Sequence, residues 1–114
     1  MSNLGKVGDT NMDINSLTRE ELIHVIKEHP HRIKYLKDQD NDICKVALEA
    51  NYRVLCLIRN QTEELCLFAV KQSYLALAYT RVQTQKIVDE AIKQDRDAVY
   101  YVDNKIALAE GYYK

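Results

Sequence analysis

Histidine, cysteine and carboxylate side chains are the groups from which metal binding or covalent catalysis would have to come. The chain has three histidines and three cysteines, and His29 and His31 stand two residues apart, which puts them on different faces of a helix. No cysteine or carboxylate lies at metal-ligand spacing from them, and no histidine is placed to activate a cysteine. Phosphate-loop, G-x-S-x-G and H-E-x-x-H motifs are missing. The sequence therefore predicts no catalytic residue, no metal, no cofactor and no enzyme activity.

Tyrosine and basic side chains are the other residues that could bind a partner, and they recur in rows. The chain has eight Tyr against one Phe and no Trp. At a spacing of 22 residues or its multiples recur Tyr35, Tyr79 and Tyr101 and, two positions later, Lys37, Arg59 and Arg81. Such rows suit a protein partner, or a single-stranded nucleic acid through stacking and charge. Packing between repeats is the competing interpretation of the tyrosines. A net charge of −1 weighs against nucleic acid, so we expect a protein partner.

These rows belong to an internal repeat. The chain aligns to itself without gaps at a period of 22 residues, in units 18–39, 40–61, 62–83 and 84–105. Ala47, Ala69 and Ala91 fall at one position of the repeat, and a glutamine closes each of the first three units. Self-similarity at a fixed period of this length is typical of stacked repeat proteins.

The helix-capping residues within the units predict two helices per unit. The first position holds a good N-cap residue in every unit, and the twelfth does so in the last three; the residues are Thr18, Asp40, Thr62 and Thr84, then Asn51, Ser73 and Asp95. Apolar residues between them follow helical spacing. Each unit is thus expected to form a helix of about ten residues, a tight turn and a second helix of about eight. The predicted fold class is all-α, a solenoid of short αα-hairpins with four 22-residue units.

The repeat also places the remaining reactive side chains. Cys44 and Cys66 share their position with Leu and Val, and Cys56 shares its position with Ala78, so all three are expected as thiols in or near the core. His24, at the position of Val and Phe in the next units, is expected to be half-buried. An odd number of cysteines without a C-x-x-C spacing suits a reducing compartment.

The two ends are expected to differ. Residues 1–15 are interpreted as a flexible tail and 16–114 as one α-helical repeat domain, with Glu21 and Arg32 as polar substitutions in an N-terminal capping unit. Residues 106–114 are expected to form a partial helix. The fourth unit keeps Ile87, Val99 and Val102 on its outer side, which favours a homodimer through residues 87–113. Its expected contacts include Ile106, Leu108, Tyr112 and Tyr113. A tail folded back on the domain is the alternative.

Two stretches carry a family resemblance, QTEELCLFAVKQSYLALAYTRVQ and TQKIVDEAIKQDRDAVYYV. They resemble the tandem repeats catalogued as domain of unknown function 4116, found in large DNA viruses of amoebae and in some bacteria and protists. The resemblance covers residues 40–105 well and 18–39 loosely, and this chain lacks the family's usual Gly or Asn-Gly in the mid-unit turn. It implies a helical fold and a viral origin, with no catalytic residues to transfer.

These observations predict a non-enzymatic helical-repeat protein that acts as a protein–protein interaction or scaffolding module. The alternative is a nucleic-acid-binding repeat protein that uses the Lys/Arg ridge and the Tyr rows. No apolar run approaches the roughly 18 residues of a membrane span, and the first ten residues lack the apolar stretch of a signal peptide. We therefore expect an intracellular protein, in the host cytoplasm or the virion if it is viral.

Overall fold

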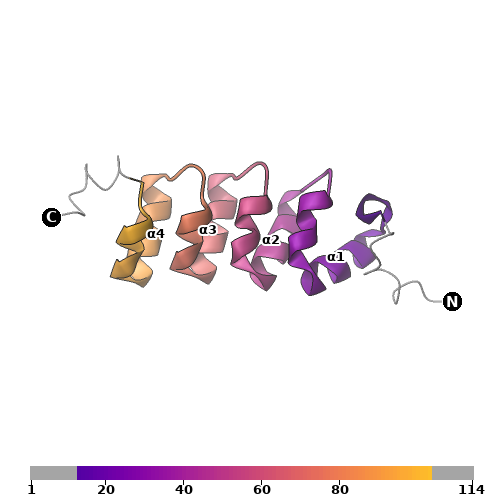
Figure 1. The fold of residues 1–114 in the computed structure, drawn as a ribbon, viewed down its shortest axis with the longest axis horizontal. Coiled ribbons are helices and arrows are strands. Elements are labelled where there is room, and N and C mark those ends of the chain that lie inside the picture. The colour runs from indigo at the N-terminus through magenta and orange to yellow at the C-terminus, as the bar shows by residue number, and fades with distance from the viewer. Residues whose placement is uncertain (1–12, 104–114) are drawn as a thin grey trace.

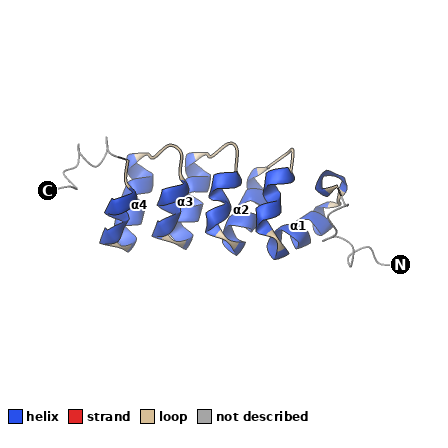
Figure 2. Cartoon of the chain, viewed as in Figure 1, coloured by secondary structure: helices blue, strands red, loops and turns tan. Residues whose placement is uncertain are grey.

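The computed structural model describes residues 13–103, and within this range all regular secondary structure is helical (Figure 2). Four α-helices alternate with 3-10 helices. In chain order they are η2 (Ile14–Ser16), α1 (Arg19–Glu28), η3 (Pro30–Tyr35), α2 (Asn41–Ala50), η4 (Tyr52–Leu57), α3 (Glu63–Gln72), η5 (Tyr74–Tyr79), α4 (Gln85–Gln94) and η6 (Arg96–Tyr101). The all-α prediction is confirmed.

The first helices have the expected length and caps. Each of α1 to α4 has ten residues, and the residue before it accepts a hydrogen bond from the backbone N–H three positions on. These N-caps are the predicted Thr18, Asp40, Thr62 and Thr84. Glu21 completes a capping box by accepting from the backbone N–H of Thr18. Side-chain caps of this kind fix where each helix begins.

The second helices differ from the expectation of about eight α-helical residues. Each is a 3-10 helix of six residues. Asn51, Ser73 and Asp95 cap them by accepting from the N–H two positions on, whereas the His29 side chain makes no capping bond and Pro30 follows it. A 3-10 helix rises about 2.0 Å per residue. Six residues therefore span about 12 Å, close to the 15 Å of the ten-residue α-helix beside them.

The helices form two rows along one axis (Figure 1). Each α-helix packs against the next α-helix, and each 3-10 helix from η3 onward packs against the next one. The α-helix that follows a 3-10 helix also lies against it, as α2 does on η3. The molecule measures 62 × 21 × 19 Å, and its radius of gyration of 16.5 Å exceeds the roughly 13 Å of a globule of this length.

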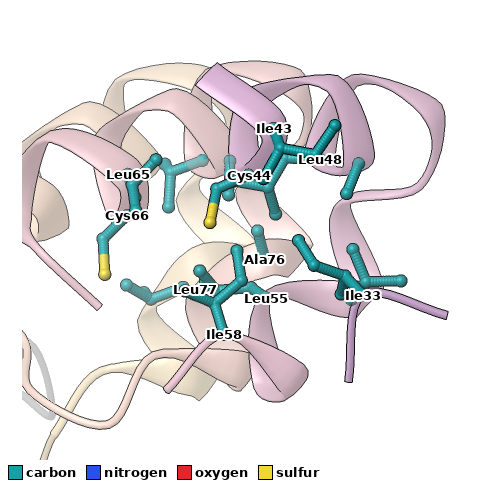
Figure 3. Close-up of a cluster of buried hydrophobic side chains, with 14 of the residues drawn as sticks. Ile33, Ile43, Cys44, Leu48, Leu55, Ile58, Leu65, Cys66, Ala76 and Leu77 are labelled. Carbon is teal, nitrogen blue, oxygen red and sulfur yellow. The ribbon is translucent and has the colours of Figure 1, made fainter. Parts of the chain in front are cut away.

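The core lies between the two rows. In Figure 3, Ile43, Cys44 and Leu48 of α2 point toward Leu55 of η4, and Leu65 and Cys66 of α3 continue the same layer. Ala47, Ala69 and Ala91 are fully buried in α2, α3 and α4. A larger side chain there would push adjacent α-helices apart, so the recurrence of alanine reflects their close approach.

The folded region begins earlier in the chain than the sequence predicts. Residues 13–15 were expected in the tail, but Asp13 caps η2 and Ile14 is buried in the core. Ile14 stands 22 residues before Leu36, which is buried too, so the repeat pattern begins with the end of a partial preceding unit. The rest of the expected tail (1–12) and the expected partial helix with Ile106, Leu108, Tyr112 and Tyr113 lie outside the described residues.

Candidate interaction surface

A glutamine side chain bridges each pair of consecutive units. The Gln61 amide donates to the carbonyls of Leu55 at 2.8 Å and Tyr79 at 3.1 Å. Its Oε1 accepts from the backbone N–H of Arg81 at 2.9 Å. One side chain therefore holds the end of its own 3-10 helix, η4, and the backbone of Tyr79 and Arg81 in the next unit. The bonds to the Tyr79 carbonyl and from the Arg81 N–H satisfy backbone groups of the next unit, whereas the Leu55 carbonyl also accepts from the backbone N–H of Ile58.

The same arrangement recurs along the molecule, and we call it the glutamine ladder (Gln39, Gln61 and Gln83). Gln39 donates to Ile33 at 2.9 Å and Leu57 at 3.0 Å, and Gln83 donates to Leu77 at 3.3 Å and Tyr101 at 2.9 Å. Their Oε1 atoms accept from the N–H groups of Arg59 at 2.9 Å and Asp103 at 2.6 Å. Asn15 makes the equivalent bonds for the first unit, to Tyr35 O at 3.2 Å and from Lys37 N at 2.8 Å.

The two arginines expected to contact a partner, Arg59 and Arg81, bind the preceding unit through their side chains. The Arg59 guanidinium donates to the carbonyls of Leu36, of Lys37 at 3.0 Å and of Lys34 at 3.5 Å. Arg81 repeats this pattern on the carbonyls of Ile58, of Arg59 at 3.1 Å and of Cys56 at 3.3 Å. The fork of guanidinium donors suits such a cluster of carbonyls better than an ammonium would. Recurrence of arginine here thus has an internal explanation.

Four tyrosines gather along η4, η5 and η6, and we call them the tyrosine surface (Tyr52, Tyr74, Tyr79 and Tyr101). The ring centroids of Tyr52 and Tyr79 lie 6.4 Å apart. Partial desolvation raises the pKa of Tyr74, with smaller contributions from Asp95, Asp97, Tyr101 and Tyr52. Tyr52, Tyr74 and Tyr79 are half-buried and Tyr101 is exposed. Of the predicted tyrosines, Tyr79 and Tyr101 therefore belong to one surface.

Tyr35 lies apart from that surface, on η3, with the Lys34 ammonium 5.0 Å from its ring centroid. Tyr100, which is 77% exposed, was not predicted, because its repeat equivalents Cys56 and Ala78 are not aromatic. Tyr52 and Tyr74 share one repeat position at the start of two second helices, and this row was a second tyrosine row predicted to suit a partner.

Charges of opposite sign flank the tyrosine surface. The Arg53 guanidinium lies 5.1 Å from the Tyr52 ring centroid, a cation–π distance. At the other end, the carboxylates of Asp95 and Asp97 act on Tyr74. The surface thus combines aromatic area, hydroxyl groups and both signs of charge.

The α-helical row is joined by ion pairs between consecutive helices. Arg19 binds Asp40 through two hydrogen bonds, at 2.6 and 3.0 Å, and Lys45 binds Glu64 at 2.7 Å. The Arg19 guanidinium lowers the pKa of Asp40, and the Lys45 ammonium lowers that of Glu64. Exposed pairs of this kind contribute about 0–1 kcal/mol each, so they add less to the row than the buried contacts do.

The cysteine and histidine placements are only partly as expected. Cys44 and Cys66 are buried, and burial raises the pKa of the Cys44 thiol to about 11 and that of Cys66 in the same direction. Cys56, in contrast, is exposed on η4, as is Ala78 on η5. His24 is exposed rather than half-buried, because within the described residues no α-helix precedes α1 for its side chain to lie against.

The expected apolar side of the fourth unit is also smaller than predicted. Ile87 and Val102 are 1% and 5% exposed, so both already belong to the core. Val99 is half-buried, as is Ile92. Two of the three apolar residues that favoured a homodimer are therefore buried within the chain itself.

Within residues 13–103, no three His, Cys, Asp or Glu side chains cluster in a way that could hold a metal ion. In the same range, no helix combines the length and the hydrophobicity required to cross a membrane. Comparison with models of known protein families, with curated proteins and with solved structures gives no match to this chain.

Proposed function

We propose that this chain is a solenoid of four 22-residue helical units that acts as a non-enzymatic protein–protein interaction or scaffolding module. The regular recurrence of helix, cap and bridging glutamine supports the solenoid. In such proteins each unit contacts only its neighbours, and the elongated surface is available to partners. The polar side chains that bridge the units are occupied in holding them together.

The observation that carries the interaction function is the tyrosine surface. Tyrosine gives a partner a large apolar ring together with a hydroxyl group, at little cost in side-chain entropy. Tyr52, Tyr74 and Tyr79 are held half-buried against the core, so their rings are already ordered before a partner arrives. Preordered side chains lose less entropy on binding. The flanking Arg53 and the aspartates on η6 and its cap would orient the partner by charge.

The test is affinity capture from source cells, followed by titration of the purified partner against the chain. We expect the double variant Tyr74→Ser/Tyr101→Ser to lose the partner. The control is Val82→Ser, because Val82 is 71% exposed and outside the tyrosine surface. Circular dichroism would establish that both variants are folded. Equal partner affinity in wild type and double variant would contradict the proposed surface.

Nucleic-acid binding receives less support from the geometry. Two of the three cations of the proposed ridge, Arg59 and Arg81, each donate to three carbonyls of the preceding unit. We therefore expect a labelled single-stranded oligonucleotide to show no change in anisotropy even at about 50 mM salt, where phosphate contacts are strongest. Binding that weakens steeply with added salt would revive this alternative.

The proposal extends to origin. The pattern of residues 61–102 supports membership of the domain of unknown function 4116 family, and with it a viral source and an intracellular location.

A further inference from the structure

The outer side of the fourth unit is an incomplete copy of an interface found three times inside the chain. Two core positions are fully buried in each of the first three units; they are Ile26, Leu48 and Val70 on the α-helices and Ile33, Leu55 and Leu77 on the 3-10 helices. The α-helix of the next unit packs on both of these elements. In the fourth unit the equivalent Ile92 and Val99 are only half-buried.

Ile92 and Val99 line a pocket of about 280 Å³ together with Arg96, Asp97 and Tyr100. We call this pocket the terminal seat. Its floor consists of the two apolar positions that the next α-helix covers elsewhere, and Tyr100 beside it is the most exposed large apolar residue of the described range. The seat is therefore the place where a fifth α-helix would pack.

The three internal interfaces show which side chains such a helix must bring. The third, fourth and seventh residues of α2, α3 and α4 are buried, and each position keeps one kind of apolar side chain. They are Ile43, Leu65 and Ile87, then Cys44, Cys66 and Val88, then Ala47, Ala69 and Ala91. These positions lie on one helix face, so the complement is one large aliphatic, one small apolar side chain and one alanine.

Residues 105–114 do not carry this complement in their sequence. In the repeat register, Glu110 falls at the Cys/Val position and Tyr113 at the alanine position. Lys105 stands where a glutamine ends the earlier units. The glutamine ladder, with its acceptor oxygen and donor N–H groups, is therefore not repeated at this position. A charged and a bulky side chain at these two positions would be costly against a close-packed floor.

A second copy does not offer the complement either. The required face of its α2, α3 and α4 is buried inside its own row. On α1 the equivalent Leu22 and Val25 are 8% and 2% exposed, and Glu21 occupies the aliphatic position. Exposing any of these faces would require the copy to unfold in part.

We infer that the terminal seat binds an amphipathic α-helix of a partner protein, which carries an aliphatic, small and alanine stripe like that of α2 to α4. The inference rests on the proposed interaction function and names the chemistry of the partner. The partner helix continues the row in trans, as amphipathic helices do in apolar grooves. Arg96 and Asp97 at the rim offer both signs of charge to its polar face.

The probe is an acetylated synthetic peptide of residues 84–95, the α4 sequence, which carries Ile87, Val88 and Ala91 without a cysteine. It is titrated to about 1 mM into the ¹⁵N-labelled full chain, because a short isolated helix is only marginally stable and binds weakly. We expect saturable shifts of the amides of Ile92, Arg96 and Val99. The control peptide Ala91→Glu, with a charge in the centre of the stripe, should produce none.

Protein variants localise the effect. Ile92→Lys should abolish the shifts, whereas Val82→Lys, on an exposed link, should leave them unchanged. The Tyr74→Ser/Tyr101→Ser variant should still bind the peptide, which separates the seat from the tyrosine surface. Retained partner capture without peptide binding would overturn the seat and leave the proposed function standing.

Three other results would also overturn the inference. Absence of saturable shifts at 1 mM peptide, or shifts confined to the tyrosine surface, would show that the seat does not bind a helix. Peptide binding only by a chain ending at Lys105 would assign the seat to residues 106–114. A dimer detected by light scattering, dissociating as the peptide binds, would assign it to a second copy.

Discussion

A glutamine side chain has one acceptor oxygen and two donor hydrogens, and Gln61 uses both kinds on backbone groups of two units. No other side-chain type of this length presents donors and acceptor in the same plane. The recurrence of glutamine at the end of each unit is visible in the sequence. Its role is not, because the three bonds go to backbone atoms whose positions depend on the neighbouring unit.

Replacing Gln61 with leucine should destabilise the protein by about 1–3 kcal/mol, because it leaves the carbonyls of Leu55 and Tyr79 and the N–H of Arg81 without this partner. Urea unfolding measures the change. Gln72→Leu, at an exposed position of α3, is the matched control and should change stability little. Equal effects of the two substitutions would contradict the ladder.

Arg81→Lys separates geometry from charge. The substitution keeps the positive charge but removes the fork that reaches the carbonyls of Cys56, Ile58 and Arg59. We expect a loss of about 1–2 kcal/mol in thermal or urea unfolding. Arg96→Lys, at the rim of the terminal seat, serves as the control. An unchanged stability of Arg81→Lys would mean that only the charge matters.

The buried Cys44 thiol predicts a pH dependence of stability. Burial raises its pKa from the ordinary 9.0 to about 11, so the folded state holds the proton more tightly than the unfolded state. Below pH 9 both states are protonated and the stability is complete; as pH rises from 9 toward 11 it falls. Cys44→Val, with the residue found at this position in α4, should show a smaller fall in urea midpoint over this window.

Among the elements, the α-helices were predictable and the 3-10 helices were not. Threonine or aspartate at the first position of each unit favours a helix start there. Asn51, Ser73 and Asp95 favour a helix start too, but they cap 3-10 and α-helices alike. A six-residue 3-10 helix spans about 12 Å, a length close to the roughly 15 Å of the ten-residue α-helix beside it. The exposure of Cys56 escaped prediction because its repeat equivalent, alanine, occurs both in cores and on surfaces.

The alanine position tests the close approach of the α-helices. Ala69→Leu should cost about 1–3 kcal/mol, because the side chain is fully buried between packed elements and extra methylenes force them apart. Ala50→Leu, exposed at the last position of α2, is the control and should be close to neutral. Thermal unfolding of both variants gives the comparison. An unchanged melting temperature for Ala69→Leu would contradict the packing.

On the scale of the whole molecule, contacts between successive elements replace a single central core. The radius of gyration of 16.5 Å reflects this arrangement. A period of this length in the sequence favours such an arrangement, since units that bury their apolar faces against the next unit form a row. What the sequence could not provide is the closure at the N-terminal end of the described residues. Ile14 stands at the repeat spacing from Leu36, but Asn15 lies two positions before the glutamine register, and its role depends on hydrogen bonds with Tyr35 of η3 and Lys37 of the following link.

Stability should therefore vary along the row. Leu48, Val70 and Ile92 occupy the same helical position, but Ile92 is only half-buried in the last described unit. Hydrogen exchange should be slower at the amides of Leu48 and Val70 than at that of Ile92, since a terminal unit opens with loss of one interface rather than two. Equal protection at the three amides would mean that the chain unfolds as one cooperative body.

The side-chain hydrogen bonds between units also give the row a direction along the chain and a fixed repeat length. Each bridging glutamine reaches toward the C-terminus, and each bridging arginine reaches back toward the N-terminus. A duplicated segment of 22 residues inserted after Gln61 would meet the same partners on both sides. An insertion of any other length would detach a glutamine from its carbonyls and turn the following apolar residues out of the core. Evolution can therefore lengthen or shorten such a chain only in whole units, and always with the same polarity.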